Sequence, residues 1–215
     1  MKPYVKFAYS FDELSPSAQD NARDYWRAHD GGENLRLSAE YLSDWYCDIF
    51  NTLGGSYDSR KAQWDVSYSG RDGAAIACHI TARNVLEHLD ELKTVAPGLL
   101  ENIPALPKIS PYLERLIRAG DITIDASGAP SHTACCPVQV TDHDIDERVD
   151  GAKHHPRAYH DCALIGEWLE DLINTAAHYF YTCLQKDYEW HQSAECIDET
   201  MRANEYEFDA NGAMI

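Results

Sequence analysis

Apolar residues spaced three and four positions apart recur along most of the chain, and this spacing predicts helices. Ser15-Pro16 and Ser110-Pro111 are typical helix starts, because serine caps free N–H groups and proline suits the first helical position. We expect helices over 16–30, 34–52, 81–95 and 111–119, each followed closely by glycine or by a Pro-Gly pair.

The strongest helical signal lies over about residues 160–203. Its apolar stripe comprises Ile165, Trp168, Leu169, Leu172, Ile173, Ala176, Phe180 and Leu184. The stripe then continues with a shifted phase through Trp190, Ala194, Ile197 and Met201, so we expect a kink or break near residues 185–190.

Two other segments alternate with a period of two, which is typical of strands. The first runs from Trp64 to Tyr68, turns over 69–73 and returns to Ile80; the second runs from Ile122, turns over 127–130 and returns over 131–140. Shorter extended segments are expected at 4–11 and from Glu205 onward. We expect a loop or a set of short turns over 97–111 and a loop over 141–160.

These elements predict an α+β protein, with an antiparallel sheet of about four strands from two hairpins, covered by helices including the long C-terminal one. No segment is rich enough in linker residues to divide the chain. We therefore expect one domain over residues 1–215, with an acidic helical part at 160–215.

The charged residues predict a globular protein with a strongly acidic surface. The chain holds 36 acidic and 18 basic residues, a net charge of -18. Residues 161–215 alone hold 12 acidic and two basic residues, so more than half of the excess lies in the last quarter. This excess argues against direct binding to nucleic acid or to an anionic membrane. It fits a basic partner, or a solvated helix face with no partner.

Cellular location follows from what the sequence lacks. The first residues hold no continuous apolar run typical of a secretion signal, and no run approaches the roughly 20 residues of a membrane helix. The seven cysteines are an odd number and are scattered. We expect reduced thiols in a cytoplasm.

Motifs that carry chemistry are weak. Cys135-Cys136, His143 and the segment 154–162 hold metal-ligand types without a recognised zinc spacing, so we expect no metal and no cofactor. Residues 142–153 begin like a calcium loop but lack its glycine and its final glutamate. Cys78 and His79 are neighbours on a predicted strand and should face apart. Nucleotide-binding and hydrolase motifs are absent, so no catalytic residue is predicted.

The acidic surface is therefore the main candidate site. DNA carries one charge per roughly 1.7 Å of its axis, and carboxylates along a helix can imitate that pattern toward a basic groove. The predicted partner-binding residues are Asp142, Asp144, Asp146, Glu147, Asp150, Asp187, Glu189, Glu195, Asp198, Glu199, Glu205, Glu207 and Asp209. The aromatic residues Tyr188, Trp190 and Tyr206 are candidate anchors for the contact.

Three segments resemble a group of uncharacterised bacteriophage and prophage accessory proteins. They are residues 9–23 (YSFDELSPSAQDNAR), residues 69–75 (SGRDGAA) and residues 203–208 (ANEYEF). The resemblance implies a phage protein made in a bacterial cytoplasm, and some members of the group are labelled antitoxin-like. Phage accessory proteins commonly block host defence, such as CRISPR complexes and restriction enzymes.

Three kinds of function stay open at this point. The first is a non-enzymatic inhibitor that binds a basic host protein or nucleoprotein complex by nucleic-acid mimicry. The second is an antitoxin-like or regulatory binding partner. The third is a metal-dependent hydrolase or modifying enzyme with a site assembled from distant residues. The sequence does not fix the oligomeric state.

Overall fold

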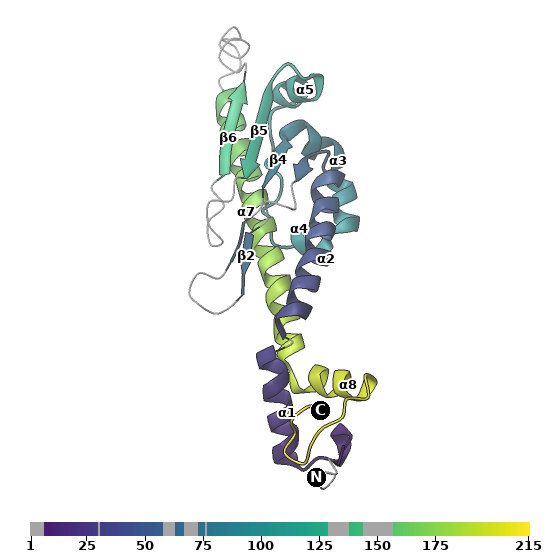
Figure 1. The fold of residues 1–215 in the computed structure, drawn as a ribbon. Coiled ribbons are helices and arrows are strands. Elements are labelled where there is room, and N and C mark those ends of the chain that lie inside the picture. The colour runs from purple at the N-terminus through teal and green to yellow at the C-terminus, as the bar shows by residue number, and fades with distance from the viewer. Residues whose placement is uncertain are drawn as a thin grey trace. The chain divides into compact units, whose positions relative to one another are not determined.

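The computed structural model describes residues 7–29, 31–57, 63–66, 73–75, 77–128, 138–143 and 157–215, without the side chains of 31–35, 47, 57 and 138–143. Figure 1 shows the fold. Contacts gather into two compact units: unit 1 contains residues 1–40 and 184–215, and unit 2 contains residues 41–183. The expectation of one domain over the whole chain stays a prediction.

Unit 2 is built around an antiparallel sheet of four strands. Its order is β1 (Ser56–Tyr57), β4 (Cys78–Thr81), β5 (Thr123–Gly128) and β6 (Val138–His143) (Figure 1). The α+β class with a sheet of this size is confirmed. The predicted first hairpin forms a separate ribbon of two strands, β2 (Gln63–Asp65) and β3 (Gly73–Ala75). The predicted return strand of this hairpin ran to Ile80, but its second half is β4, which pairs with β5 instead.

Strand alternation decides which face of this sheet is buried. Cys78 and Ile80 of β4 are buried, and their partners across the ladder, Gly128 and Ala126 of β5, are buried too. His79, between the two buried positions of β4, is exposed. Cys78 and His79 therefore face apart as the sequence predicted.

Helices pack against the sheet of unit 2. α3 (Ala82–Val95) contacts β4, β5, α4 (Pro97–Leu100) and α5 (Pro111–Ala119). Residues 97–111, predicted to be a loop, thus begin with a short helix. Ser110 caps α5 by accepting the N–H of Leu113, and Gly120 ends the helix at φ 77°. Both ends of α5 confirm the prediction.

A second set of buried contacts joins α7 (Arg157–Gln192) to the second half of α2 (Gly31–Thr52) within unit 2. All eight residues of the predicted apolar stripe of α7 are buried. The Tyr46 hydroxyl donates to the carbonyl of Ala176, and the rings of Tyr46 and Phe180 lie 4.6 Å apart. Asp161 is buried and accepts the Ser110 N–H at 2.9 Å, which satisfies a free group at the start of α5.

Strand β6 extends into the predicted loop 141–160, and two predicted helix boundaries are wrong. α2 begins at Gly31 directly after α1 (Pro16–His29), so the glycine pair starts a helix as well as ending one. The expected break near 185–190 lies at Ser193, where α7 gives way to α8 (Ala194–Ala203). The Ser193 side chain accepts the N–H of Cys196, so a serine cap fixes the break rather than the shift in apolar phase.

Unit 1 has its own apolar cluster. Its buried members are Phe11, Leu14, Ala18, Ala22, Trp26, Ile197, Met201 and Phe208. They come from η1 (Phe11–Glu13), α1, α8 and the C-terminal residues. The extended segments predicted near both ends meet here, because Phe208 bridges Tyr9 and Met214. A Cβ on Gly212 (φ 86°) would lie 2.0 Å from the Ala18 carbonyl oxygen, so the chain end packs tightly on α1.

Candidate functional site

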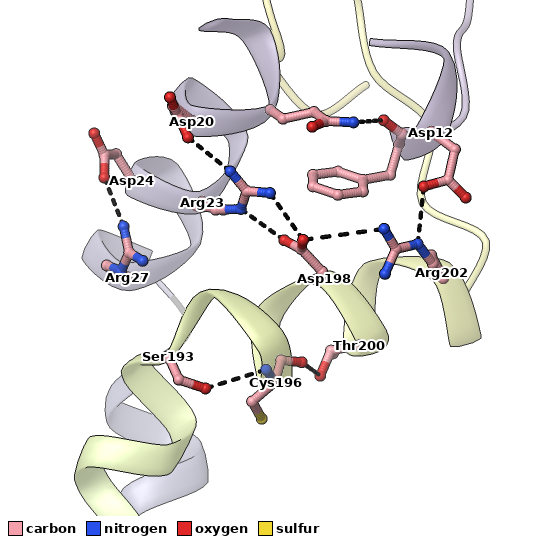
Figure 2. A network of polar contacts seen from close by, with 12 residues as sticks. Asp12, Asp20, Arg23, Asp24, Arg27, Ser193, Cys196, Asp198, Thr200 and Arg202 are labelled. Carbon is pink, nitrogen blue, oxygen red and sulfur yellow. Dashed lines mark hydrogen bonds and ion pairs between the residues drawn. The ribbon is translucent and has the colours of Figure 1, made fainter. Parts of the chain in front are cut away.

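The predicted acidic site divides into carboxylates that hold unit 1 together and carboxylates that face solvent. Asp198 on α8 is the clearest of the first kind. It accepts two hydrogen bonds from Arg23 of α1, at 2.7 and 2.8 Å, and both side chains are more than four-fifths buried (Figure 2). This bidentate contact raises the pKa of Arg23, chiefly through its hydrogen bond with Asp198. Asp198 is therefore a structural residue.

The same network continues along α8 toward η1. Arg202 donates to Asp12 at 2.9 Å and also lies 4.0 Å from Asp198 (Figure 2). The guanidinium groups of Arg23 and Arg202 each lie 5.4 Å from the centre of the Phe11 ring. An aromatic ring beside two cations adds attraction to the salt bridges, and the network fixes α8 against η1 and α1.

Two further predicted partner-binding aspartates have internal contacts. Asp209 accepts the backbone N–H groups of Asn211 and Ala213, which shapes the C-terminal turn. Asp187 lies 3.5 Å from His191, one helical turn along α7. Asp209 therefore stabilises local structure, as Asp198 does, whereas Asp187 faces His191.

The second group consists of four glutamates in and after α8. Glu195 and Glu199 lie four residues apart, about 6 Å along the helix axis. Glu205 and Glu207 follow in the C-terminal segment, and all four are exposed. Within the part of the chain that the structure describes, none of them contacts a cationic side chain. We call these four residues the free glutamates. Glu189, on the last turns of α7, is also exposed and accepts from Gln185 at 3.3 Å.

Glu205 has an unusual backbone. It follows Asn204, the C-cap of α8, with φ 53°, and it is the one non-glycine residue with positive φ among those described. Its N–H donates to the carbonyl of Arg202, and the next N–H, of Tyr206, donates to that of Met201. This hydrogen-bond pattern ends many helices and usually has glycine where Glu205 stands.

A pocket of about 460 Å³ lies beside the last two free glutamates. Residues 8–13, 201, 202 and 205–207 line it. Its walls thus combine the carboxylates of Asp12, Glu13, Glu205 and Glu207 with the side chain of Tyr206. Two hydrogen bonds from Ser10 lower the pKa of Glu13, the backbone N–H more than the hydroxyl, so Glu13 is ionised at neutral pH.

The predicted aromatic anchors differ in exposure. Trp190 is 45% exposed, whereas Tyr188 is half-buried. Tyr206 is half-buried and its ring lies 5.6 Å from that of Trp26. Trp190 is therefore the most accessible of the three.

Most of the acidic residues predicted to bind a partner from the loop 141–160 lie outside the described residues. Asp144, Asp146, Glu147 and Asp150 lie outside the described residues, as do Cys135 and Cys136. Asp142 belongs to β6, opposite Ile124 of β5.

The described residues contain neither a clustered set of metal ligands nor a membrane-spanning helix. Among them, no three His, Cys, Asp or Glu side chains are arranged to hold a metal ion. No helix in the same ranges is long and apolar enough to cross a lipid bilayer.

One cluster of reactive side chains was not predicted from the sequence. Asp187, His191 and Cys196 lie in contact at the junction of α7 and α8, all within unit 1. The spacing of four and five residues would have indicated it only if the helix break had been placed at Ser193.

Comparison with known proteins gives no relative: no family model, curated protein or solved structure matches the chain. The resemblance to phage accessory proteins therefore stays a prediction.

Proposed function

We propose that this protein is a non-enzymatic, phage-type inhibitor that binds the basic, nucleic-acid-binding surface of a bacterial defence complex, in the host cytoplasm. The observation that carries the proposal is the set of free glutamates, Glu195, Glu199, Glu205 and Glu207. The neighbouring Asp198 is paired with arginine within unit 1, yet these four carboxylates are exposed and have no cationic partner among the described residues.

Electrostatics supports a binding role for such a surface. Exposed like charges repel one another, so a surface of this kind favours a partner that supplies lysine or arginine. The axial spacing of about 6 Å between Glu195 and Glu199 is close to twice the roughly 3.4 Å of duplex axis per phosphate of one DNA strand. The lysine and arginine side chains of a groove that binds nucleic acid would therefore find carboxylates at about the spacing of every second phosphate.

The experiment measures DNA cleavage by purified CRISPR effectors and restriction endonucleases in the presence of the protein. We expect at least one enzyme to be inhibited, and the inhibition to weaken by about tenfold between roughly 0.05 and 0.2 M salt, because ions screen exposed charges. The variant E195Q/E199Q/E205Q/E207Q should lose about tenfold or more in affinity for that enzyme.

A matched control removes the same number of charges elsewhere. Glu101, Glu167, Glu170 and Asp171 are exposed residues of unit 2, and E101Q/E167Q/E170Q/D171N changes the net charge equally. This variant should inhibit nearly as well as the wild type. Equal losses in the two variants, or an affinity that does not change with salt, would contradict the proposal.

A further inference from the structure

A thiol, an imidazole and a carboxylate lie in a row where α7 ends and α8 begins. The Sγ of Cys196 lies 3.8 Å from Nδ1 of His191, and Nε2 of His191 lies 3.5 Å from Oδ2 of Asp187. The Ser38 hydroxyl is 3.4 Å from the same Nε2. Nucleophile, base and orienting carboxylate in this order are the arrangement that activates cysteine and serine nucleophiles.

Local structure explains why the three side chains meet. Asp187 and His191 are four residues apart on α7, so they share one helix face. Ser193 then ends α7 and caps α8, which places Cys196 in the first turn of α8 (Figure 2). Thr200 donates to the carbonyl of Cys196 at 2.8 Å and holds that turn.

The Oδ2 atom of Asp187 has no hydrogen-bond donor among the described residues unless His191 provides one. This atom is shielded from solvent, and no hydrogen bond reaches it from the described residues. When His191 carries a second proton, Nε2–H faces this oxygen as an ion pair. The carboxylate is thus placed to stabilise an imidazolium.

The Cys196 thiol is protonated at neutral pH, so its reaction depends on a base that removes the proton. Burial raises the pKa of Cys196; the hydrogen bond with Thr200 opposes this effect, and the charges of Glu199 and Asp187 add to it. A thiol of high pKa gives a strongly nucleophilic thiolate but little of it at neutral pH. A neighbouring base therefore has the largest effect on such a thiol. Arg27 of α1 donates to the Gln192 carbonyl at 3.1 Å, so a cation lies at the end of α7 beside this group.

We propose that Cys196 is a site of reversible mixed-disulfide formation with low-molecular-weight disulfides, with His191 as the base and Asp187 as a positioning residue. His191 takes the thiol proton while Sγ attacks one sulfur of the disulfide. A new S–S bond forms, the old one breaks, and the leaving thiolate takes the proton from the imidazolium. One half of the reagent leaves as a thiol and the other half stays bound to Cys196 in a disulfide, so the oxidising equivalent of the original disulfide passes to the mixed disulfide and no further oxidant is needed.

The test incubates the reduced full chain with glutathione disulfide and follows each cysteine by mass spectrometry. Cys183, which is half-buried in unit 2, is the internal control. Cys196 should react about tenfold faster or more than Cys183, and H191Q should slow Cys196 by about a hundredfold while leaving Cys183 unchanged. D187N should slow it less and shift the pH dependence.

The pH profile of the wild type keeps the test independent of whether a variant folds. Base assistance by His191 predicts that the Cys196 rate rises less steeply than tenfold per pH unit while the thiol is still protonated. A simple exposed thiol instead gains about tenfold per pH unit until it ionises. The second profile, a rate no faster than that of Cys183, or an unchanged rate in folded H191Q would overturn the proposal.

Discussion

Replacing Glu205 with glycine is expected to stabilise the protein and weaken its binding at the same time. Glu205 holds φ 53° at the end of α8, where the hydrogen bonds of the helix terminus require a left-handed residue. Its side chain is exposed and contacts no described cation, so the change removes no stabilising interaction of that kind.

The size of the effect follows from two opposing terms. A left-handed backbone costs a residue with a Cβ about 1–2 kcal/mol, which glycine does not incur. Glycine also makes the unfolded chain more flexible, which lowers stability by about 0.4–1 kcal/mol. The net expectation for E205G is a gain of about 0.5–1 kcal/mol in the free energy of unfolding.

A second variant separates the backbone from the charge. E205Q keeps the left-handed Cβ and removes the carboxylate, so its stability should stay within about 0.5 kcal/mol of the wild type. Both variants should bind the target enzyme less tightly. Urea denaturation followed by circular dichroism measures stability, and amide exchange of the α8 peptides assigns the change to unit 1.

The result that would refute the reasoning is a glycine variant no more stable than the glutamine variant. In that case the left-handed conformation would cost nothing at this position. If both variants bind the target as tightly as the wild type, Glu205 would not belong to the binding surface.

Three other predictions test the division of the acidic residues and the packing of unit 1. D198N should destabilise the protein by about 1.5–3 kcal/mol, because it breaks a bidentate contact with a largely buried arginine; E199Q should change stability by less than about 0.5 kcal/mol in the same urea titration. G212A should lower stability by about 2 kcal/mol or more in thermal unfolding, since the new Cβ meets an α1 carbonyl at φ 86°. The hydrogen bonds from Ser10 lower the pKa of Glu13. They therefore stabilise the folded protein fully above pH 4.5, the ordinary pKa of this carboxyl group, and this contribution is lost as the pH falls through the lowered pKa. Amide exchange of residues 10–14, corrected for intrinsic rates, should show this loss in the wild type and not in E13Q.

Local patterns predicted the elements whose causes are local. The serine cap, proline and glycine of α5 lie within eleven residues, and each confirmed boundary depends on neighbours in the chain. The apolar stripe of α7 is likewise a repeating local signal, and all its predicted positions are buried.

Strand pairing was harder to predict because it is decided by distant segments. The first hairpin has the right alternation, yet its strands form their own ribbon while β4 joins β5 across more than 40 residues. Alternation shows which face of a strand is buried, but not which strand lies beside it.

The adjacent residues Asp198 and Glu199 show the same limit at the candidate site. Both are acidic residues of one helix, and the sequence assigned both to partner binding. Asp198 instead pairs with Arg23, 175 residues away in the chain, whereas Glu199 is exposed. The role of a carboxylate depends on which cation the fold brings to it.

The arginines of unit 1 explain why the free glutamates have no partner among the described residues. Arg23, Arg27 and Arg202 pair with aspartates at positions 12, 20, 24 and 198, and Arg36 pairs with Glu40. Neutralising the α8 surface with one of these arginines would therefore mean breaking a pair that stabilises unit 1, including the bidentate one. Because bidentate, partly buried pairs are costly to break, these arginines are held away from the free glutamates, and a partner that supplies lysine or arginine would neutralise charges that they leave uncompensated.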